Sequence, residues 1–368
     1  MVSISLCMIV KDEEATIERC LNSVKDVVDE INIVDTGSTD RTKEIVSKYT
    51  ERVYDFKWEN HFAKARNFSF ERATKEYILW LDADDVFLEE ERRKLAELKE
   101  NLDPSIDSVT MKYILGMDEN GNITSVIRRN RLVKRSNGFK WHGMVHEYLE
   151  VGGNILNSDI SLTHLSEKHD HDRNLLIYEQ QLKEGNPLTI RDLFYYANEL
   201  KDHQQYEKAI DYYEKFLSSG KGWVEDNIVA CGRLADCYHH MGNHEKELDA
   251  VLHSFKYDIP RPEFCCRLGY HFLNKEEYHT AIHWYKQAIQ CEVDDENWGF
   301  KSPSFNTWLP NLQLCVCYDR IGDYDMAYHH NEIASQYRPN DPSILHNKTY
   351  LESILFTSNV NAGSADGC

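Results

Sequence analysis

The sequence predicts two domains: an α/β domain with a Rossmann-like, mostly parallel sheet, and a following all-α domain of helical repeats. Up to about residue 135, short β-rich runs alternate with helical ones, as in a parallel sheet covered on both faces. After about residue 172 aromatic-rich helical segments replace the strand pattern. We therefore place the α/β domain at 1–172, the repeat domain at 173–360 and a flexible tail at 361–368.

The first domain alternates strand and helix segments in a regular order. The expected strands are "ISLCMIV", "EINIVDT", "RVYDF" and "EYILWLD", and the expected helices after them are "EEATIERCLNSV", "STDRTKEIVSKY", "HFAKARNFSFERA" and "LEEERRKLAELKENL". A continuous apolar strand such as "YILWL" fits a sheet that is buried on both faces. Three later segments, "SVTMKYILG", "GNITSVIRRNRLVKR" and "GFKWHGMVHEYLEV", predict further strands of the same domain.

The second domain contains four approximate copies of one helical pattern. Their anchor residues, Ala197, Ala235, Gly269 and Cys315, are 38, 34 and 46 residues apart. The middle spacing equals the tetratricopeptide period, and the pattern resembles tetratricopeptide repeats over about residues 190 to 340. Small residues let paired helices approach while Tyr and Leu fill the gap. The second copy departs from the pattern, because Glu247 stands where a small residue is expected.

Composition and charge exclude several classes of partner. The net charge of -20 argues against a nucleic-acid backbone or an anionic membrane as a partner. The apolar start "MVSISLCMIV" indicates a first strand rather than a signal peptide, and no segment has the length of a membrane span. Ten scattered cysteines without a secretion signal predict free thiols in a cytoplasmic protein.

Acidic residues follow the buried strand "YILWL" directly, in the segment Asp82-Ala83-Asp84-Asp85. Ligands of open parallel α/β sheets bind beyond the carboxyl ends of the strands. Carboxylates that crowd together repel one another unless a cation sits among them, and oxygen ligands suit Mg²⁺ or Mn²⁺. Asp82 and Asp84 therefore predict a clamp that presents a metal to a diphosphate. A solvated turn or a helix cap is the alternative.

A second strand, in "INIVDTGSTDRT", ends at Asp35. Its carboxylate is placed to accept hydrogen bonds from a base edge or a ribose, and Gly37 allows a tight turn. A turn followed by a helix N-cap is the alternative explanation for the same residues.

The ordered segments "SLCMIVKDEEATIERCLNSV", "INIVDTGSTDRT", "FAKARNFSFERA" and "ILWLDADD" resemble the amino-terminal half of family 2 glycosyltransferases with the GT-A fold. The resemblance implies transfer of a sugar from a nucleotide diphosphate, most often UDP, with inversion at the anomeric carbon. It implies that Asp35 binds the uridine and that Arg66 of "ARN" positions the nucleotide-sugar. Asp82 and Asp84 then form the D-x-D element, with Asp82 facing the ribose or sugar and Asp84 the metal. Lys64 is an equally available cation for the pyrophosphate.

Inverting transfer needs a general base on the acceptor side of the pocket. The segment "FKWHGMVHEYLEVGG" offers Trp141, His142, His146 and Glu147. Some bacterial members of the family have a similar "HE" pair, and this resemblance favours Glu147 as the base. His146 is the alternative, since a neutral imidazole can accept a proton near pH 7. A strand with alternating polar residues would also explain the segment, and Trp141 is expected either to stack on a sugar or acceptor or to pack in the core.

Histidines follow the acceptor region in "ISLTHLSEKHDHDRNLL". In GT-A enzymes a histidine at a strand end after this region often completes the metal shell, which favours His164 as a ligand beside Asp84. The later run from His169 to Asp172 is expected to be a polar linker that caps the next helix rather than a second metal cluster.

The predicted function is that of a metal-dependent inverting glycosyltransferase that uses a UDP-sugar and Mg²⁺ or Mn²⁺. Tetratricopeptide arrays form concave surfaces suited to extended peptides, so a peptide or protein side chain, Cys or Ser/Thr, is the expected acceptor. The domain order also resembles that of sublancin-type peptide S-glycosyltransferases. One alternative is a glycosyltransferase that acts on a saccharide or lipid-linked acceptor. A non-catalytic repeat scaffold is a second alternative. Repeat surfaces and exposed aromatics are compatible with a homodimer.

Overall fold

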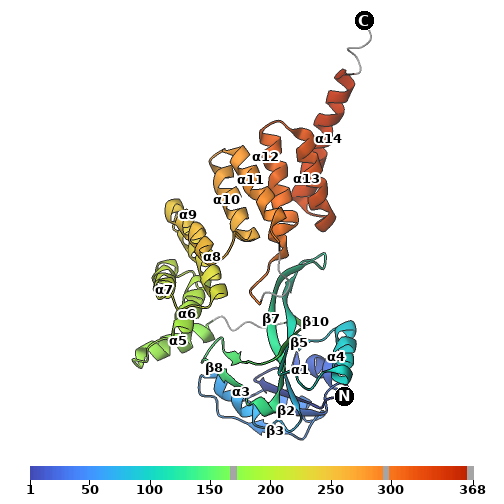
Figure 1. Cartoon of the computed structure of the whole chain (residues 1–368), viewed down its shortest axis with the longest axis vertical. Helices are drawn as coiled ribbons and strands as arrows, with labels where there is room; N and C mark the ends of the chain where they lie inside the picture. The colour runs from blue at the N-terminus through green and yellow to red at the C-terminus, as the bar shows by residue number, and fades with distance from the viewer. Residues whose placement is uncertain (166–171, 293–297, 363–368) are drawn as a thin grey trace. The chain divides into compact units, whose positions relative to one another are not determined.

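The computed structural model describes residues 1–165, 172–292 and 298–362. The chain divides into two compact units: the first contains 1–116, 126–199 and 298–300, and the second contains 117–125 and the described residues of 200–295 and 301–362. Figure 1 shows the strands in the first half of the chain and helices throughout the second. The predicted fold class is confirmed. The predicted domain boundary after residue 172 stays a prediction, since these units group residues by packing.

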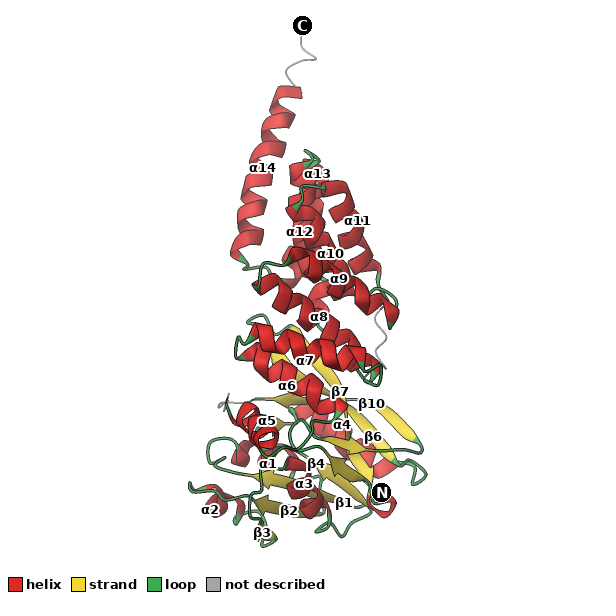
Figure 2. Ribbon diagram, turned by 90° about the vertical axis from the view of Figure 1, so that its left-hand side faces the viewer, coloured by secondary structure: helices red, strands yellow, loops and turns green. Residues whose placement is uncertain are grey.

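An eight-stranded mixed sheet forms the centre of unit 1 and is drawn in yellow in Figure 2, in the order β3-β2-β1-β4-β7-β6-β10-β5. The strands are β1 (Ile4–Val10), β2 (Glu30–Asp35), β3 (Val53–Asp55), β4 (Tyr77–Trp80), β5 (Asp85–Val86), β6 (Ser108–Met117), β7 (Ile123–Lys134) and β10 (Ile155–His164). Strands β1 to β4 run parallel, and β6 is parallel to β10. β7 is antiparallel to β4, and β5 is antiparallel to β10.

Both faces of the sheet are buried, as the continuous apolar strands predicted. The helices of this half are α1 (Ile17–Val24), α2 (Thr42–Val46), α3 (Phe62–Phe70) and α4 (Glu89–Asn101). Successive side chains of a strand point to opposite faces. Leu6 of β1 belongs to the core that includes Leu21 of α1, whereas its neighbour Cys7 belongs to the core that includes Phe70 of α3. Burial on both sides holds the strand ends in fixed positions.

The segment "GFKWHGMVHEYLEV" forms a separate two-stranded sheet, with β8 (Lys140–His142) antiparallel to β9 (Tyr148–Glu150). Residues 143–147 connect the two strands. His146 has a positive φ of 50°, which is uncommon for a residue with a side chain. His146 and Glu147 therefore lie in a tightly turned connection, so the alternative of one strand with alternating polar residues does not describe them.

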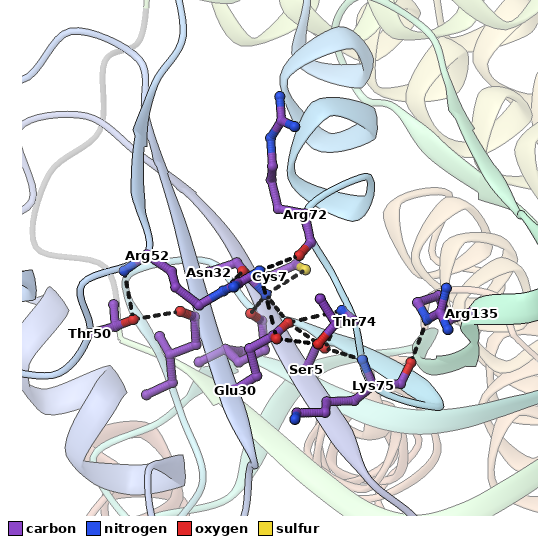
Figure 3. A network of polar contacts seen from close by, with 12 residues as sticks. Ser5, Cys7, Glu30, Asn32, Thr50, Arg52, Arg72, Thr74, Lys75 and Arg135 are labelled. Atoms are coloured by element: carbon purple, nitrogen blue, oxygen red, sulfur yellow. Dashed lines mark hydrogen bonds and ion pairs between the residues drawn. The ribbon is translucent and has the colours of Figure 1, made fainter.

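A polar network joins the amino-terminal ends of β1 and β2 (Figure 3), at the opposite end of these strands from Asp35. Glu30 accepts hydrogen bonds from Ser5 Oγ at 2.8 Å, Asn32 Nδ2 at 2.7 Å and the Thr74 backbone N–H at 3.0 Å. Burial by itself raises the pKa of Glu30, but these hydrogen bonds lower it to about 2. The carboxylate therefore ties two strands to the turn before β4.

We expect Glu30→Gln to lower the free energy of unfolding by about 1–3 kcal/mol at neutral pH, because one amide N–H₂ would face hydrogen-bond donors. The depressed pKa gives a stabilisation that is present above about pH 4.5 and is lost as the pH falls toward 2. The difference in unfolding free energy between parent and variant should therefore narrow between about pH 5 and pH 3. Urea unfolding followed by circular dichroism measures it, and a difference that stays constant over this range would contradict the assignment.

Unit 2 consists mainly of packed helix pairs that match the predicted repeats. Its helices, with the two that precede them, are α5 (Arg173–Lys183), α6 (Ile190–Asp202), α7 (Tyr206–Ser218), α8 (Val224–His240), α9 (His244–His253), α10 (Pro262–Asn274), α11 (Tyr278–Gln290), α12 (Trp308–Arg320), α13 (Tyr324–Tyr337) and α14 (Pro342–Ala362). Helices α8–α9, α10–α11 and α12–α13 pack in pairs, and α14 packs on α13. Helix α5 and most of α6 group with unit 1.

The anchor Gly269 shows why the repeats need small residues. A Cβ atom at this position would lie 2.6 Å from Cε1 of the buried Tyr285. The helix pair α10–α11 can approach only because this side chain is absent. Among the described helices, none combines the length and apolar composition that crossing a bilayer requires. Most of the predicted tail, residues 363–368, lies outside the described part of the chain.

Candidate active site

Asp35 is the last residue of β2, and only one of its two carboxylate oxygens has a hydrogen-bond partner within the described residues. Its Oδ1 accepts hydrogen bonds from the backbone N–H groups of Gly37 at 2.9 Å and Ser38 at 3.0 Å. Its Oδ2 is buried and has no hydrogen-bond partner within the described residues. Gly37 adopts a φ of 111°, which glycine tolerates and other residues rarely adopt. The turn therefore fixes the carboxylate and leaves a buried acceptor oxygen for a donor group from a ligand.

Arg66 of α3 lies between two of the predicted site carboxylates. Its Nη2 is 2.7 Å from Asp82 Oδ1, and its Nε is 2.5 Å from Glu147 Oε1. Its guanidinium carbon is 4.8 Å from the ring centroids of both Trp80 and Trp141. Burial by itself would lower the pKa of Arg66, but the two carboxylates raise it above its ordinary value. One buried cation thus joins the first carboxylate of the D-x-D element to the predicted base.

Lys64 and Trp141, two further predicted site residues, differ in their exposure to solvent. Lys64 is exposed and pairs with Glu59 at 2.7 Å, whereas Arg66 occupies the interior. Trp141 is buried and packs edge-on against Trp80, with ring centroids 4.7 Å apart. Its observed neighbours are thus aromatic core residues and the guanidinium of Arg66. The predicted contact of Trp141 with a sugar or acceptor stays a prediction.

Asp84 and His164, the two predicted metal ligands, lie close together with Asp85. His164 Nδ1 is 3.4 Å from Asp84 Oδ1, 3.5 Å from Asp85 Oδ1 and 2.9 Å from the hydroxyl of Tyr113. The neighbouring carboxylates of Asp84 and Asp85 raise the pKa of His164 to about 10, although burial acts in the opposite direction.

This cluster fits a divalent cation. The ligand atoms of Asp84, Asp85 and His164 all lie within 4.8 Å of one another. Two carboxylates and one imidazole suit Mn²⁺, and carboxylates completed by water and phosphate oxygens suit Mg²⁺. Because a ligating imidazole nitrogen must be unprotonated, coordination through His164 requires the loss of its proton.

Arg131 of β7 is a central residue that the sequence analysis missed. Its side chain is fully buried, and its Nη1 lies 3.0 Å from Oδ2 of the equally buried Asp85. Its guanidinium carbon is 3.8 Å from the ring centroid of Trp80 and 4.3 Å from that of Tyr113. In "VIRRNRLVK" the strand pattern does not distinguish a buried arginine from the exposed polar residues that alternate with apolar ones.

The charges at the ends of β4 and β10 are therefore balanced differently from the prediction. The sequence analysis assigned the compensation of the acidic segment to a metal. In the structure the carboxylates of Asp82, Asp84, Asp85 and Glu147 lie among the guanidinium groups of Arg66 and Arg131 and the imidazole of His164. Two arginines thus provide the first compensation. The four carboxylates still outnumber the arginines, which leaves negative charge for a divalent cation.

His146 is held by helix α6, although it is adjacent to Glu147. Its Nε2 lies 2.7 Å from Glu199 Oε1, and its ring stacks on Tyr195 with centroids 4.3 Å apart. Arg191 donates to the His146 carbonyl at 3.3 Å. Glu199 is 53 residues further along the chain, in a segment whose pattern indicates a repeat helix, so no sequence signal pointed to this contact. The two candidate bases have separate partners.

His169, Asp170 and His171, which the sequence analysis assigned to a polar linker, lie outside the described residues. The linker interpretation stays a prediction.

The family described as "Glycosyl transferase family 2" matches residues 5–149. The match includes the four ordered motifs that predicted a resemblance to this family.

Relatives with this domain are known in several bacteria. The chain is 33% identical over 235 residues to the SPbeta prophage-derived glycosyltransferase SunS of Bacillus subtilis, a match that covers 60% of this chain and 54% of SunS. It is 28% identical over 197 residues to the lipopolysaccharide core biosynthesis glycosyltransferase LpsC of Rhizobium meliloti, which covers 51% of this chain and 70% of LpsC. The match thus spans about half the length of SunS.

A comparison of structures finds helical repeat proteins. A thermophilic TPR protein of Thermus thermophilus matches with a TM-score of 0.35 and 18% sequence identity, over 50% of this chain and 91% of that one.

Proposed function

We propose that this protein is an inverting, metal-dependent glycosyltransferase that moves a sugar from a UDP-sugar to a peptide or protein side chain. The observation that carries the proposal is the continuous contact from Asp82 through Arg66 to Glu147, inside a family 2 glycosyltransferase domain. It connects a residue of the predicted donor site to the predicted base. Any nucleotide-sugar that contacts Asp82 would lie beside the group that activates the acceptor.

The donor side of the proposal rests on Asp35, Arg66 and the Asp84–His164 pair. The buried Oδ2 of Asp35 can accept a hydrogen bond from the imide N–H of uracil. Arg66 holds a permanent positive charge near the position proposed for the diphosphate. Asp84 and His164 would hold a Mg²⁺ or Mn²⁺ ion, which would supply further positive charge for the departing diphosphate.

For the base we propose Glu147, with His146 as the alternative. Arg66 engages Oε1 of Glu147, which orients the other carboxylate oxygen to take the proton of the acceptor. His146 has the features of an oriented base too, because Glu199 holds its Nε2 and its Nδ1 could accept a proton. The contact with Arg66 favours Glu147, since it places that residue next to the donor side.

Glu147→Gln is expected to lower the turnover of the donor at least about 100-fold, because the amide cannot accept the proton. The matched control is His146→Gln, which leaves Glu147 in place. UDP released from UDP-glucose or UDP-N-acetylglucosamine with Mn²⁺ gives the rates, and stabilisation against heat by UDP shows that the nucleotide still binds. A large loss in His146→Gln together with a parental rate in Glu147→Gln would transfer the role to His146.

The acceptor class is a separate part of the proposal. Helical repeats offer extended surfaces for peptides, and this favours a peptide or protein acceptor. The similarity to LpsC favours a second candidate, a saccharide or lipid-linked acceptor. Mixtures of Cys- and Ser-containing peptides, and separately lipopolysaccharide core oligosaccharides, can be offered with the donor and analysed by mass spectrometry for an added hexose. Modification of the oligosaccharides alone would establish the second candidate.

The basic proposal is tested with the full chain and no acceptor. Slow release of UDP from a UDP-sugar, dependent on Mg²⁺ or Mn²⁺, is the expected result, with water as the substitute acceptor. If no UDP-sugar releases UDP and no nucleotide raises the melting temperature, the proposal fails and a non-catalytic repeat scaffold is favoured instead.

A further inference from the structure

The second repeat contains a cluster of metal-binding side chains at the turn between α8 and α9. Glu247, which replaces the small residue expected by the repeat pattern, turns its carboxylate toward two imidazoles. Its Oε2 is 3.0 Å from His239 Nδ1 and 3.0 Å from His244 Nδ1. The side chain of Glu247 is 18% exposed, whereas those of His239 and His244 are 43% and 66% exposed. The departure from the repeat pattern therefore coincides with a His-His-Glu group open to solvent.

The backbone of the turn holds these three residues in place. Gly242 has a φ of 70°, which reverses the chain after α8, and its N–H donates to the carbonyl of His239 at 2.9 Å. Asn243 caps α9, because its side chain accepts from the backbone N–H of Lys246 at 3.1 Å. His239 thus lies at the end of one helix, while His244 and Glu247 lie in the first turn of the next. Ligands on helix ends of this kind are positioned before any ion binds.

We propose that His239, His244 and Glu247 form a Zn²⁺ site that is separate from the Asp84 cluster. Their ligand atoms lie within 4.8 Å of one another. Tetrahedral Zn²⁺ with ligands at about 2.0–2.1 Å separates those ligand atoms by roughly 3.3 Å, so the observed 3.0 Å contacts need to change little. Two imidazoles and one carboxylate are a common zinc ligand set with one open position.

The chemistry of the group selects the ion. A carboxylate oxygen only accepts, so each imidazole presents a hydrogen on Nδ1 to Glu247. Zn²⁺ takes the place of these two hydrogens when the neutral rings adopt the tautomer protonated on Nε2. Mg²⁺ prefers oxygen ligands and its own waters, so it competes poorly for two imidazoles. The site should therefore take Zn²⁺ in the presence of the Mg²⁺ proposed for the Asp84 cluster.

The neighbouring histidines have different environments. The ring of His240 stacks on that of Tyr206, with centroids 4.6 Å apart, so its observed partner is Tyr206 rather than Glu247. His271 of α10 is close enough for Glu247 and His244 to influence its charge, and burial lowers its pKa. Its Nε2 is buried and has no hydrogen-bond partner within the described chain.

Zn²⁺ binding would cross-link two helices of the second repeat. Zn²⁺ would join the end of α8 to the start of α9, at the repeat in which Glu247 stands in place of a small packing residue. An ion that binds only the folded form stabilises it in proportion to the logarithm of its concentration over the dissociation constant. The stability of the repeat array would therefore depend on the zinc concentration, independently of the proposed transferase activity.

The test uses the full chain with Asp84→Asn, in excess Mg²⁺, so that the Asp84 cluster does not take up zinc. Calorimetric titration is expected to give one Zn²⁺ per chain with a dissociation constant tighter than about 10 µM. His244→Ala and Glu247→Gln should each weaken binding at least about tenfold. The control His279→Ala removes an exposed histidine of α11 outside the cluster and should leave binding unchanged.

Cobalt gives an independent measurement, since Co²⁺ in a tetrahedral site with nitrogen ligands absorbs visible light strongly. The Asp84→Asn protein should show this absorption, and Zn²⁺ should abolish it; the His244→Ala variant should lack it. Circular dichroism verifies that each variant is folded. Equal Zn²⁺ affinity in the Asp84→Asn protein and in its His244→Ala and Glu247→Gln variants would overturn the proposal. Zn²⁺ binding by the Asp84→Asn protein with a dissociation constant weaker than about 100 µM would also overturn it.

Discussion

Asp84→Asn is expected to lower the metal-dependent release of UDP at least about 100-fold. Asp85 is fully buried and paired with Arg131, whereas the side chain of Asp84 is 19% exposed and that of its neighbour His164 is 25% exposed. Asp84 is therefore the carboxylate of this cluster that an ion and a diphosphate can reach together. Loss of its charge removes a ligand without disturbing the buried ion pair.

The matched control is Asp159→Asn, on the same strand as His164 but 81% exposed and far from the strand end. It should retain the parental rate. Removal of metal with a chelator should bring the parent down to the rate of Asp84→Asn and leave that variant unaffected. If Asp84→Asn turned over its donor at the parental rate after thorough chelation, the metal assignment would have to be abandoned.

The second large effect concerns stability. Arg131→Met is expected to lower the free energy of unfolding by about 3–5 kcal/mol, because Asp85 would remain as a buried charge without its guanidinium partner. Both side chains are fully buried at a distance of 3.0 Å. The double variant Arg131→Met/Asp85→Asn should recover part of the loss, since it removes the unpaired charge as well.

Urea unfolding followed by circular dichroism measures this effect. Arg129→Met serves as the control, since Arg129 lies two residues earlier on the same strand and is partly exposed. Its expected change is below about 1 kcal/mol. If Arg131→Met were no more destabilised than Arg129→Met, the ion pair with Asp85 would have no structural role.

The parts of this protein that the sequence predicts are those governed by local periodicity. The apolar run "YILWL" predicted β4, and its position before three aspartates placed them at a strand end, because ligand sites of parallel sheets lie there. The small residues of the repeats predicted their close helix packing, as Gly269 against Tyr285 shows. In each case a few neighbouring residues contain the whole signal.

The contacts that the sequence did not predict connect distant segments. Arg131 and Asp85 are 46 positions apart, and the pattern of β7 does not show which of its arginines is buried. His146 and Glu199 are 53 positions apart, on elements that look unrelated in sequence. Long-range pairing of charged groups depends on how elements pack, and hydrophobic periodicity does not record it. The same applies to Glu247, whose departure from the pattern was visible while its two histidine partners were not.

The hold of α6 on His146 has a practical consequence for protein engineering. His146, which precedes Glu147 in the turn, contacts Arg191, Tyr195 and Glu199. All three belong to a helix that resembles the first repeat. A fragment of the α/β domain that ended where the strand pattern ends would lack these contacts. A chimaera with an exchanged repeat array should therefore be joined after residue 199, so that the turn with the proposed base stays with the part of α6 that contacts it.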